Sequence, residues 1–406
     1  MTRMSLLRLA WRYLWSQPLT AALNLLLLSL GLAAITAVLL VSEQIEAGVR
    51  RDLADIDLVV GAKGSPMQIM LAGLFHLDVP TGNIPLKTME QLLAHPLVAS
   101  AVPLSLGDSL RGFRIVGTTP DYLDLYQGQL ASGRVWTQPL QVVLGAEAAR
   151  VTGLKLGQQF AGSHGLGAQG GEHADDLYTV VGVLKDSGTV LDRLVLTDLA
   201  SVWAVHEAHH GPPGAENHTA DADAAREITL LLVRYRSPLA AISLPRWVNA
   251  QAGLQAAAPA LETARLLHMV GVGGEVLRGF GLLMLASAAL SVFVALLHAV
   301  RARQSDLAML RMLGAPPWRV AGLISLEALS LACLASVIGW VVGHAAAALL
   351  GWVLAGQQSL RITGFWLSPW EGVIPLLALG LALLAAAWPA WRAFRLDVTE
   401  LLQAPR

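Results

Sequence analysis

The uncharged stretch from Leu19 to Ser42 constrains the fold of this chain more than any other feature. It contains no Asp, Glu, Lys or Arg, and a helix rising 1.5 Å per residue over this stretch is long enough to cross a hydrocarbon core of about 30 Å. A cleaved signal peptide is the alternative. Its apolar part would run for only about 7–15 residues, and no small-x-small cleavage pattern ends this stretch. We therefore expect a retained membrane anchor over residues 19–42.

Three further apolar runs follow late in the chain, over Gly279–Val300, Val320–Leu354 and Gly372–Trp388. The 406 residues are 54% hydrophobic and 14% charged, whereas soluble domains carry about a quarter charged residues. We expect an α-helical membrane protein whose four transmembrane helices occupy residues 19–42, 277–300, 320–354 and 372–391. The third run exceeds what a bilayer needs, so it either projects from the membrane or breaks. The fourth ends in Trp388-Pro389-Ala390-Trp391-Arg392, which reads as an aromatic belt followed by a stop.

Residues 43–276 have a different character. Charged residues return, Gly and Pro interrupt the chain, and short apolar runs alternate with polar residues. This pattern predicts a large α+β domain inserted between the first and second spans. We expect strands at Phe113–Val116, Gln141–Leu144, Tyr178–Val183, Leu194–Leu196 and Ile228–Val233, and short helices at Thr88–Ala94, Ala146–Thr152 and Asp198–His206.

The arginines indicate the orientation. They gather in the amphipathic segment 1–18, in the loop 301–319 and in the tail 392–406, whereas the loop 355–371 contains only Arg361. Because arginine-rich loops stay on the cytoplasmic side, both termini and the loop 301–319 are predicted to be cytoplasmic and residues 43–276 extracytoplasmic. The segment 1–18 is rich in Leu and Trp and is expected to lie on the membrane surface, in contact with lipid.

The loop 301–319 contains a short amphipathic helix by its pattern. No helix breaker occurs from Arg303 to Leu313, and leucines recur at helical spacing. Gly314 is placed to end this helix in a left-handed conformation, and Pro316 and Pro317 are tolerated in the first turn of the next helix. Trp318 then suits the membrane interface.

The string from Asp306 to Ala315, read as DLAMLRMLGA, resembles the cytoplasmic signature of FtsX/MacB-type (type VII) ABC-transporter permeases. In that family this segment is the coupling helix that inserts into a groove of the ATPase subunit. The resemblance implies an ATPase-coupling role for Arg303, Asp306, Leu307, Met309, Leu310, Arg311, Leu313, Gly314 and Ala315. An ordinary basic loop on the cytoplasmic side is the alternative.

The order of elements is also similar to a MacB-type permease over essentially the whole chain. Trp388-Pro389-Ala390-Trp391-Arg392-Ala393 resembles the family's ending, and segments beginning at Phe113, Gln141 and Tyr178 resemble the MacB periplasmic core. The resemblance implies a bacterial inner-membrane location, a homodimer or a pairing with a second permease, a cytoplasmic ABC ATPase subunit as partner, and a possible periplasmic partner protein.

MacB itself carries a fused ATPase, and here this chain departs from it. No Gly-x-x-x-x-Gly-Lys-Ser/Thr string is present, and the nearest, Gly61-Ala-Lys63-Gly64-Ser65, has the wrong spacing. We expect no enzyme activity in this chain and no cofactor bound directly to it, with ATP and Mg²⁺ held by the partner ATPase. The net charge of −1 gives no support for nucleic-acid binding.

Three features within the spans and the external domain are candidate sites. Glu327 lies about two turns into the third span, where it could pair with Arg319 or take part in transport. Gly339 and Gly343 form a small-xxx-small face for close helix packing. His206, His209 and His210 have spacing compatible with a zinc site, although the stretch also reads as a polar loop that collects histidines without binding metal.

The function predicted from these features is that of a permease subunit which couples ATP hydrolysis by a separate ATPase to motion of its external domain, for export, extrusion or mechanotransmission. A non-transporting, FtsX-like scaffold that activates a cell-wall hydrolase is the alternative. A membrane-anchored metal sensor built on the histidines is a third possibility.

Overall fold

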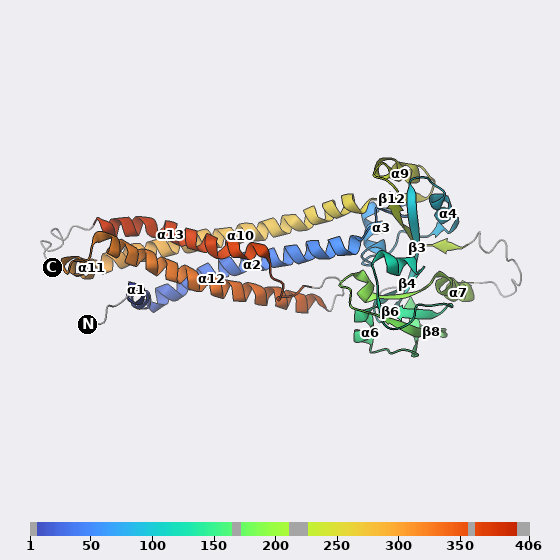
Figure 1. Cartoon of the computed structure of the whole chain (residues 1–406), viewed down its shortest axis with the longest axis horizontal. Coiled ribbons are helices and arrows are strands. Elements are labelled where there is room, and N and C mark those ends of the chain that lie inside the picture. Colours follow the sequence, from blue (N-terminus) through green and yellow to red (C-terminus); the bar gives the residue numbers. More distant parts are fainter. Residues whose placement is uncertain (1–5, 165–171, 211–225, 356–361, 396–406) are drawn as a thin grey trace, which may run out of the picture. The chain divides into compact units, whose positions relative to one another are not determined.

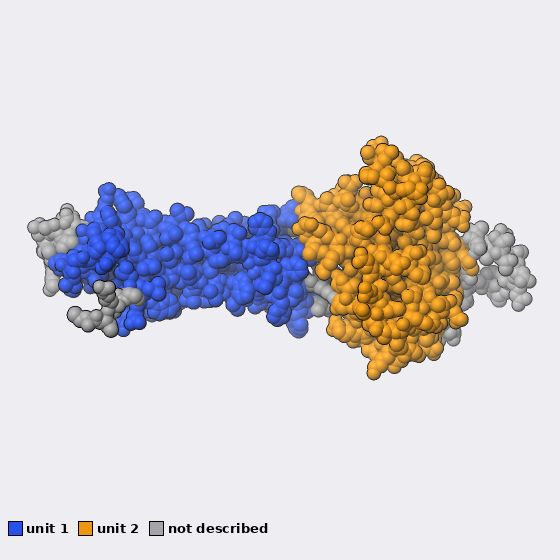
Figure 2. Space-filling model, viewed as in Figure 1, with its two compact units in different colours: residues 1–45, 269–406 blue, residues 46–268 orange. Residues whose placement is uncertain are grey.

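The computed structural model describes residues 6–164, 172–210, 226–355 and 362–395. The chain divides into two compact units, one formed by Met1–Ile45 with Met269–Arg406 and the other by Glu46–His268 (Figure 2). Each unit is described separately below.

The first unit is a helical bundle (Figure 1). Its elements are α1 (Leu6–Leu14), α2 (Pro18–Leu53), α10 (Pro259–Ala302), α11 (Gln304–Met312), α12 (Pro317–Ala355), the short 3₁₀ helix η2 (Pro369–Gly372) and α13 (Val373–Phe394). The end of α2 and the beginning of α10 belong to the second unit. Among the described residues, four helical segments are long and apolar enough to cross a membrane: Pro18–Leu53, Pro259–Ala302, Pro317–Leu354 and Pro369–Phe394.

The helices run further than the apolar stretches from which they were predicted. Helix α2 continues beyond Ser42 to Leu53, and α10 begins at Pro259 rather than near residue 277. Helix α12 is continuous, so the long third run does not break. Helix α13 passes through Pro389 and ends at Phe394, close to the expected end of the fourth span. A proline removes one backbone hydrogen bond, and a transmembrane helix tolerates that loss when neighbouring helices pack around it.

Small side chains hold the bundle together. Helix α13 packs mainly against α12. Its buried positions recur every three or four residues and are Ala378, Ala382, Ala385, Ala386, Pro389, Ala390 and Ala393. In lipid, helix association depends on close packing, and alanine allows two backbones to approach. The fourth span is therefore held by an alanine seam.

The second unit is an α+β domain. Its strands are β1 (Leu58–Ala62), β2 (Ile84–Pro85), β3 (Val98–Leu110), β4 (Phe113–Thr118), β5 (Leu130–Gly133), β6 (Gln141–Leu144), β7 (Gln159–His164), β8 (Glu172–Leu184), β9 (Leu194–Asp198), β10 (Glu227–Ile228), β11 (Leu230–Tyr235) and β12 (Leu254–Ala257). Its helices are α3 (Pro66–Gly73), α4 (Lys87–Leu93), α5 (Asp121–Leu125), α6 (Ala146–Thr152), η1 (Val190–Arg193), α7 (Leu199–His210) and α9 (Ala240–Asn249).

Most of the strands described form one mixed sheet in the order β12-β1-β11-β3-β4-β9-β6-β8-β5, with β7 pairing β3 and β8. The pairs β4–β9 and β6–β8 are parallel, and the other ladders in this sheet are antiparallel. Two apolar clusters cover it. One joins β1 and β11 to α9 through residues such as Leu58, Leu231 and Leu244. The other joins β4, β6 and β8 to α6 and α7.

Candidate functional site

The cytoplasmic signature predicted from the sequence lies on α11, which has a defined end at each terminus. The amide of Leu307 donates to the Arg303 carbonyl at 2.9 Å, which begins the helix. At the other end Gly314 has φ of +92°. Its amide donates to the Arg311 carbonyl at 3.0 Å, and the Ala315 amide donates to the Leu310 carbonyl at 3.0 Å. These two bonds form a Schellman motif, which satisfies the last carbonyls and lets the chain turn towards α12.

Helix α11 has one buried and one exposed face. Leu307 and Ala308 are buried, Leu307 in the bundle core, and Leu310 packs partly against the same core. The opposite face carries Asp306 and the apolar side chains of Met309, Met312 and Leu313, which are 57%, 55% and 80% exposed. We call these four residues the α11 outer face. Arg311 and Ala315 are half-buried.

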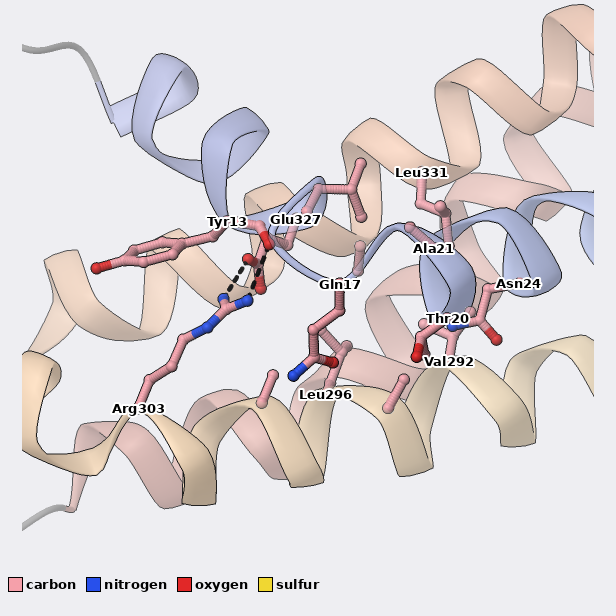
Figure 3. A pocket seen from close by; sticks show the side chains of 14 residues that line it. Tyr13, Gln17, Thr20, Ala21, Asn24, Val292, Leu296, Arg303, Glu327 and Leu331 are labelled. Carbon is pink, nitrogen blue, oxygen red and sulfur yellow. Dashed lines mark hydrogen bonds and ion pairs between the residues drawn. The ribbon is translucent and has the colours of Figure 1, made fainter.

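Arg303 does not belong to this outer face. Its guanidinium donates through Nη1 to Glu327 Oε1 at 2.8 Å (Figure 3). Through Nη2 it donates to the Tyr13 carbonyl at 2.8 Å and to the Ser16 hydroxyl. The Tyr13 ring lies 4.4 Å from the guanidinium carbon, a cation–π distance. Burial raises the pKa of the Tyr13 hydroxyl, and Asp306 raises it further, so this phenol stays neutral. Arg303 therefore ties the α1–α2 turn to α12, immediately before α11 begins.

The partner of Glu327 differs from the one expected. Sequence proximity suggested Arg319, but the structure pairs the buried Glu327 with Arg303. The reason is geometric, because eight residues along a helix separate Arg319 from Glu327 by about 12 Å. Arg319 instead lies over the neighbouring Trp318 ring at 5.3 Å. Pairing, one of the two roles considered for Glu327, is thus present with a different arginine.

A small pocket of about 50 Å³ lies beside this ion pair (Figure 3). Apolar residues of α10 and α12, including Val292, Leu296 and Leu331, line one part of it, and polar side chains line the rest. Asn24 is buried there and accepts a hydrogen bond from the Ser291 hydroxyl through Oδ1. A pocket of this size has room for a few water molecules, and its polar side chains, Glu327 among them, can hydrogen-bond to water there.

Gly339 and Gly343 face α2 at a distance that leaves no room for a side chain. A Cβ on Gly339 would lie 2.9 Å from the Ser29 carbonyl oxygen and 2.7 Å from the Leu32 Cβ. A Cβ on Gly343 would lie 2.6 Å from the Thr36 Cβ. These glycines therefore set the close approach of α12 to α2.

The predicted histidines lie on α7, which extends to His210, so the stretch 206–210 is helix rather than loop. The structure does not describe the side chains of His206, His209 and His210, nor residues 211–225. Among the His, Cys, Asp and Glu side chains that the structure describes, no group of three or more could hold a metal ion.

Sequence reasoning missed Tyr13 and Ser16, which complete the Arg303 contacts, and Gly281, whose Cβ would lie 2.8 Å from Ile35. The sequence gives little indication that Gly281 makes a close helix contact, since it is a single small residue in an apolar run. For Ser16, the polar Ser16-Gln17-Pro18 break between two helical stretches was a usable signal.

Comparison with protein families follows the same division of the chain. The profile of the FtsX-like permease C-terminal matches residues 278–398, and that of the MacB-like periplasmic core domain matches residues 21–241, more than half of the chain. The chain belongs to the FtsX/MacB-type permease family. This permease is accordingly a multi-pass membrane protein with a periplasmic domain.

Two solved structures are similar to parts of this permease. The periplasmic region of MacB from Actinobacillus actinomycetemcomitans is 14% identical, covers 53% of this chain and 94% of its own, and has a TM-score of 0.35. The extracellular domain of the noncanonic ABC-type transporter YknZ from Gram-positive bacteria is 12% identical, covers 50% of this chain and 98% of its own, and has a TM-score of 0.31. No curated protein matches the chain.

Proposed function

We propose that this permease transmits motion between a separate cytoplasmic ABC ATPase and its own periplasmic domain, and that the α11 outer face is the surface that contacts the ATPase. The observation that carries the proposal is the exposure of Met309, Met312 and Leu313 on a short helix with both ends defined. Exposed apolar side chains gathered on one helix face are typical of a docking surface, and methionine adapts well to a groove.

The orientation follows from the arginines. Arginines gather at helix ends that would lie on the same side of a membrane. They are Arg8 and Arg12 on α1, Arg301, Arg311 and Arg319 around α11, and Arg392 and Arg395 at the end of α13. In this orientation α1, α11 and both termini are cytoplasmic. The domain between α2 and α10 is then on the opposite side, as its family requires.

A rigid connection between α11 and the spans supports the proposed transmission. Arg303 is bound to three groups on two other elements, and Leu307 is packed into the bundle core. A push on the α11 outer face would therefore move α11 together with α12 and the α1–α2 turn. Helices α2 and α10 are the two chain connections to the periplasmic domain, so movement of the bundle reaches that domain through them.

The expected assembly has two permease subunits, identical or paired with a second permease, each offering one α11 to one ATPase subunit. ATP and Mg²⁺ would be held by the ATPase, and closure of its two subunits would move both copies of α11. The output is export of a substrate or the driving of a periplasmic partner.

The proposal is tested by co-purification and ATP hydrolysis. The native permease in nanodiscs is compared with a variant carrying Met309→Asp and Leu313→Asp, and with Ile242→Asp, which changes a residue of the periplasmic domain of similar exposure, 63%. We expect the α11 variant to lose capture of the ATPase by at least about tenfold, as for a buried apolar contact at an interface, and the control to bind as the native chain does. Equal capture of the ATPase by all three proteins would overturn the proposal.

A further inference from the structure

The end of the helical bundle that lies opposite α1 and α11 is closed by residues 362–372, which we call the closing segment. Gln44 of α2 binds both backbone groups of Thr363, donating to its carbonyl at 3.0 Å and accepting from its amide at 2.8 Å. Gly364 lies so close to α12 that a Cβ there would be 2.5 Å from the His344 carbonyl oxygen. The closing segment is thus in contact with both α2 and α12.

A largely buried histidine, His344, and a buried glutamate, Glu371, lie at the centre of these contacts. Nδ1 of His344 is 2.6 Å from the Gly364 carbonyl oxygen, and Nε2 is 3.2 Å from Glu371 Oε2. The side chains are only 11% and 10% exposed. The Trp340 ring lies against the imidazole at a centroid distance of 4.4 Å, with the two ring planes tilted by 51°. Both ring nitrogens therefore face hydrogen-bond acceptors in a place with little access to water.

The two acceptors determine which nitrogens of the His344 ring carry hydrogen. A carbonyl oxygen only accepts hydrogen bonds, so Nδ1 carries a hydrogen. A neutral imidazole has a single N–H, and with that hydrogen on Nδ1 the nitrogen at Nε2 would direct a lone pair at Glu371 Oε2. Two lone pairs at 3.2 Å repel each other. A second proton must lie between Nε2 and Oε2 for this contact to be favourable.

The other contacts of Glu371 place that proton on the imidazole. Its Oε2 already accepts from the Trp340 indole at 2.7 Å, and its Oε1 accepts from the Ser368 amide at 2.8 Å. Both donors are fixed by their chemistry, and they suit an ionised carboxylate. Glu43 of α2 adds a second carboxylate close by, accepting from the Ser368 hydroxyl at 2.7 Å. Glu371 of η2 contacts the ring directly, whereas Glu43 of α2 is linked to Glu371 through Ser368.

We propose that His344 and Glu371 form a proton-dependent latch, in which a charged imidazolium holds the closing segment against α2 and α12 and loss of its proton releases that segment. After deprotonation the Nε2–Oε2 contact becomes repulsive, and the buried carboxylate of Glu371 loses its neighbouring positive charge. The closing segment then exchanges these contacts for water. With the orientation proposed above, this end of the bundle senses periplasmic pH.

Hydrogen exchange of the native permease in nanodiscs tests the latch directly, because the Thr363 and Ser368 amides donate to Gln44 and Glu371. After correction for intrinsic rates, we expect protection of the closing segment to fall on the order of tenfold between about pH 5.5 and about pH 8.5. Buried strand β4 provides the reference. The same protection of the closing segment at both pH values would overturn the proposal.

Two variants separate titration of His344 from a general effect of pH. His344→Gln removes the titrating group and is expected to leave the closing segment exchanging at one rate throughout the pH range. His298→Gln changes a histidine of α10 whose Nδ1 lies 2.9 Å from the Val294 carbonyl oxygen of its own helix, and it is expected to keep the native pH response. A pH response that survives His344→Gln would assign the effect to another group and overturn the latch.

A spectroscopic measurement keeps the proposal testable even if His344→Gln fails to fold. Nitrogen-15 spectra of the native permease labelled at histidine report the protons on each ring nitrogen. We expect one histidine with both nitrogens protonated at the pH where the closing segment is protected, and loss of this signal as protection falls. A protected closing segment with no doubly protonated ring would contradict the proposal.

Discussion

Arg303 Nη1 donates to Glu327 Oε1 at 2.8 Å, which binds the residue before α11 to the interior of α12. The two side chains are 15% and 7% exposed. Because the Arg303 guanidinium also binds the α1–α2 turn, one side chain links three parts of this end of the bundle. The position of α11 therefore depends on this ion pair as well as on apolar packing.

Removing either partner of the pair should destabilise the bundle. Glu327→Ala or Arg303→Ala leaves a buried charge without its partner, for which the cost is about 3 kcal/mol. The double variant should cost less than the sum of the two, since it removes both charges. Thermal unfolding in nanodiscs measures the three variants, and strictly additive effects would show that the pair does not couple the two positions.

Glycines of α12 should differ in their tolerance of a methyl group. Gly339→Ala places a Cβ 2.7 Å from Leu32 Cβ and is expected to cost about 1–3 kcal/mol by pushing α12 away from α2. Gly322 lies on the same helix with nothing within 4 Å of its Cβ position. Gly322→Ala should be neutral or stabilise the helix by up to about 1 kcal/mol. We expect Gly339→Ala to unfold at a lower temperature than Gly322→Ala, and the reverse order would contradict the prediction.

The periplasmic domain should lose stability as the pH falls, because of His76. Burial lowers the pKa of His76 well below its usual 6.5, and Arg114 and Arg193 lower it further. Nε2 lies 3.1 Å from the Tyr122 hydroxyl, whereas Nδ1 is buried and has no hydrogen-bond partner. The unfolded chain therefore binds this proton more readily than the folded domain does.

The sign of the effect follows from linkage. The contribution of His76 is fully present above about pH 6.5 and declines as the pH falls below that value, by up to about 1.4 kcal/mol per pH unit. His76→Asn removes the titrating ring and should flatten this part of the pH profile of unfolding. His95→Asn, which changes a half-buried histidine packed on Trp247, is the control. A native profile with no decline between about pH 6.5 and about pH 5 would contradict the prediction.

Short helices and strands of this fold were predictable where the apolar pattern and the glycines or prolines beside it indicated the same boundary. Gly314 favours the left-handed conformation that ends a helix, and the prolines that follow it cannot continue the helix. The Schellman motif forms at this position. Strand β6 and helix α6 have the predicted bounds, because a glycine separates an apolar run from a helix-forming one.

Features that depend on tertiary packing were not predictable in the same way. The partner of Glu327 is 24 positions away, in the turn between α10 and α11, and no local pattern selects Arg303 over Arg319. The contacts of His344 with Gly364 and Glu371 depend on how residues 362–372 fold back on α12. The helix ends at Leu53 and Pro259 were also missed, since charged residues mark the end of an apolar run and not the end of a helix.

Cross-linking to the ATPase tests the central claim most directly. In a chain whose single cysteine is removed by Cys333→Ala, cysteines are placed one at a time at Met309 and Leu313, and at the buried Leu307 and Ala308 of the same helix. We predict disulfide or short-linker cross-links to the ATPase from Met309 and Leu313 and none from the two buried positions. Cross-links that form equally from both faces, or from neither in an active complex, would contradict the assignment of the α11 outer face as the ATPase contact.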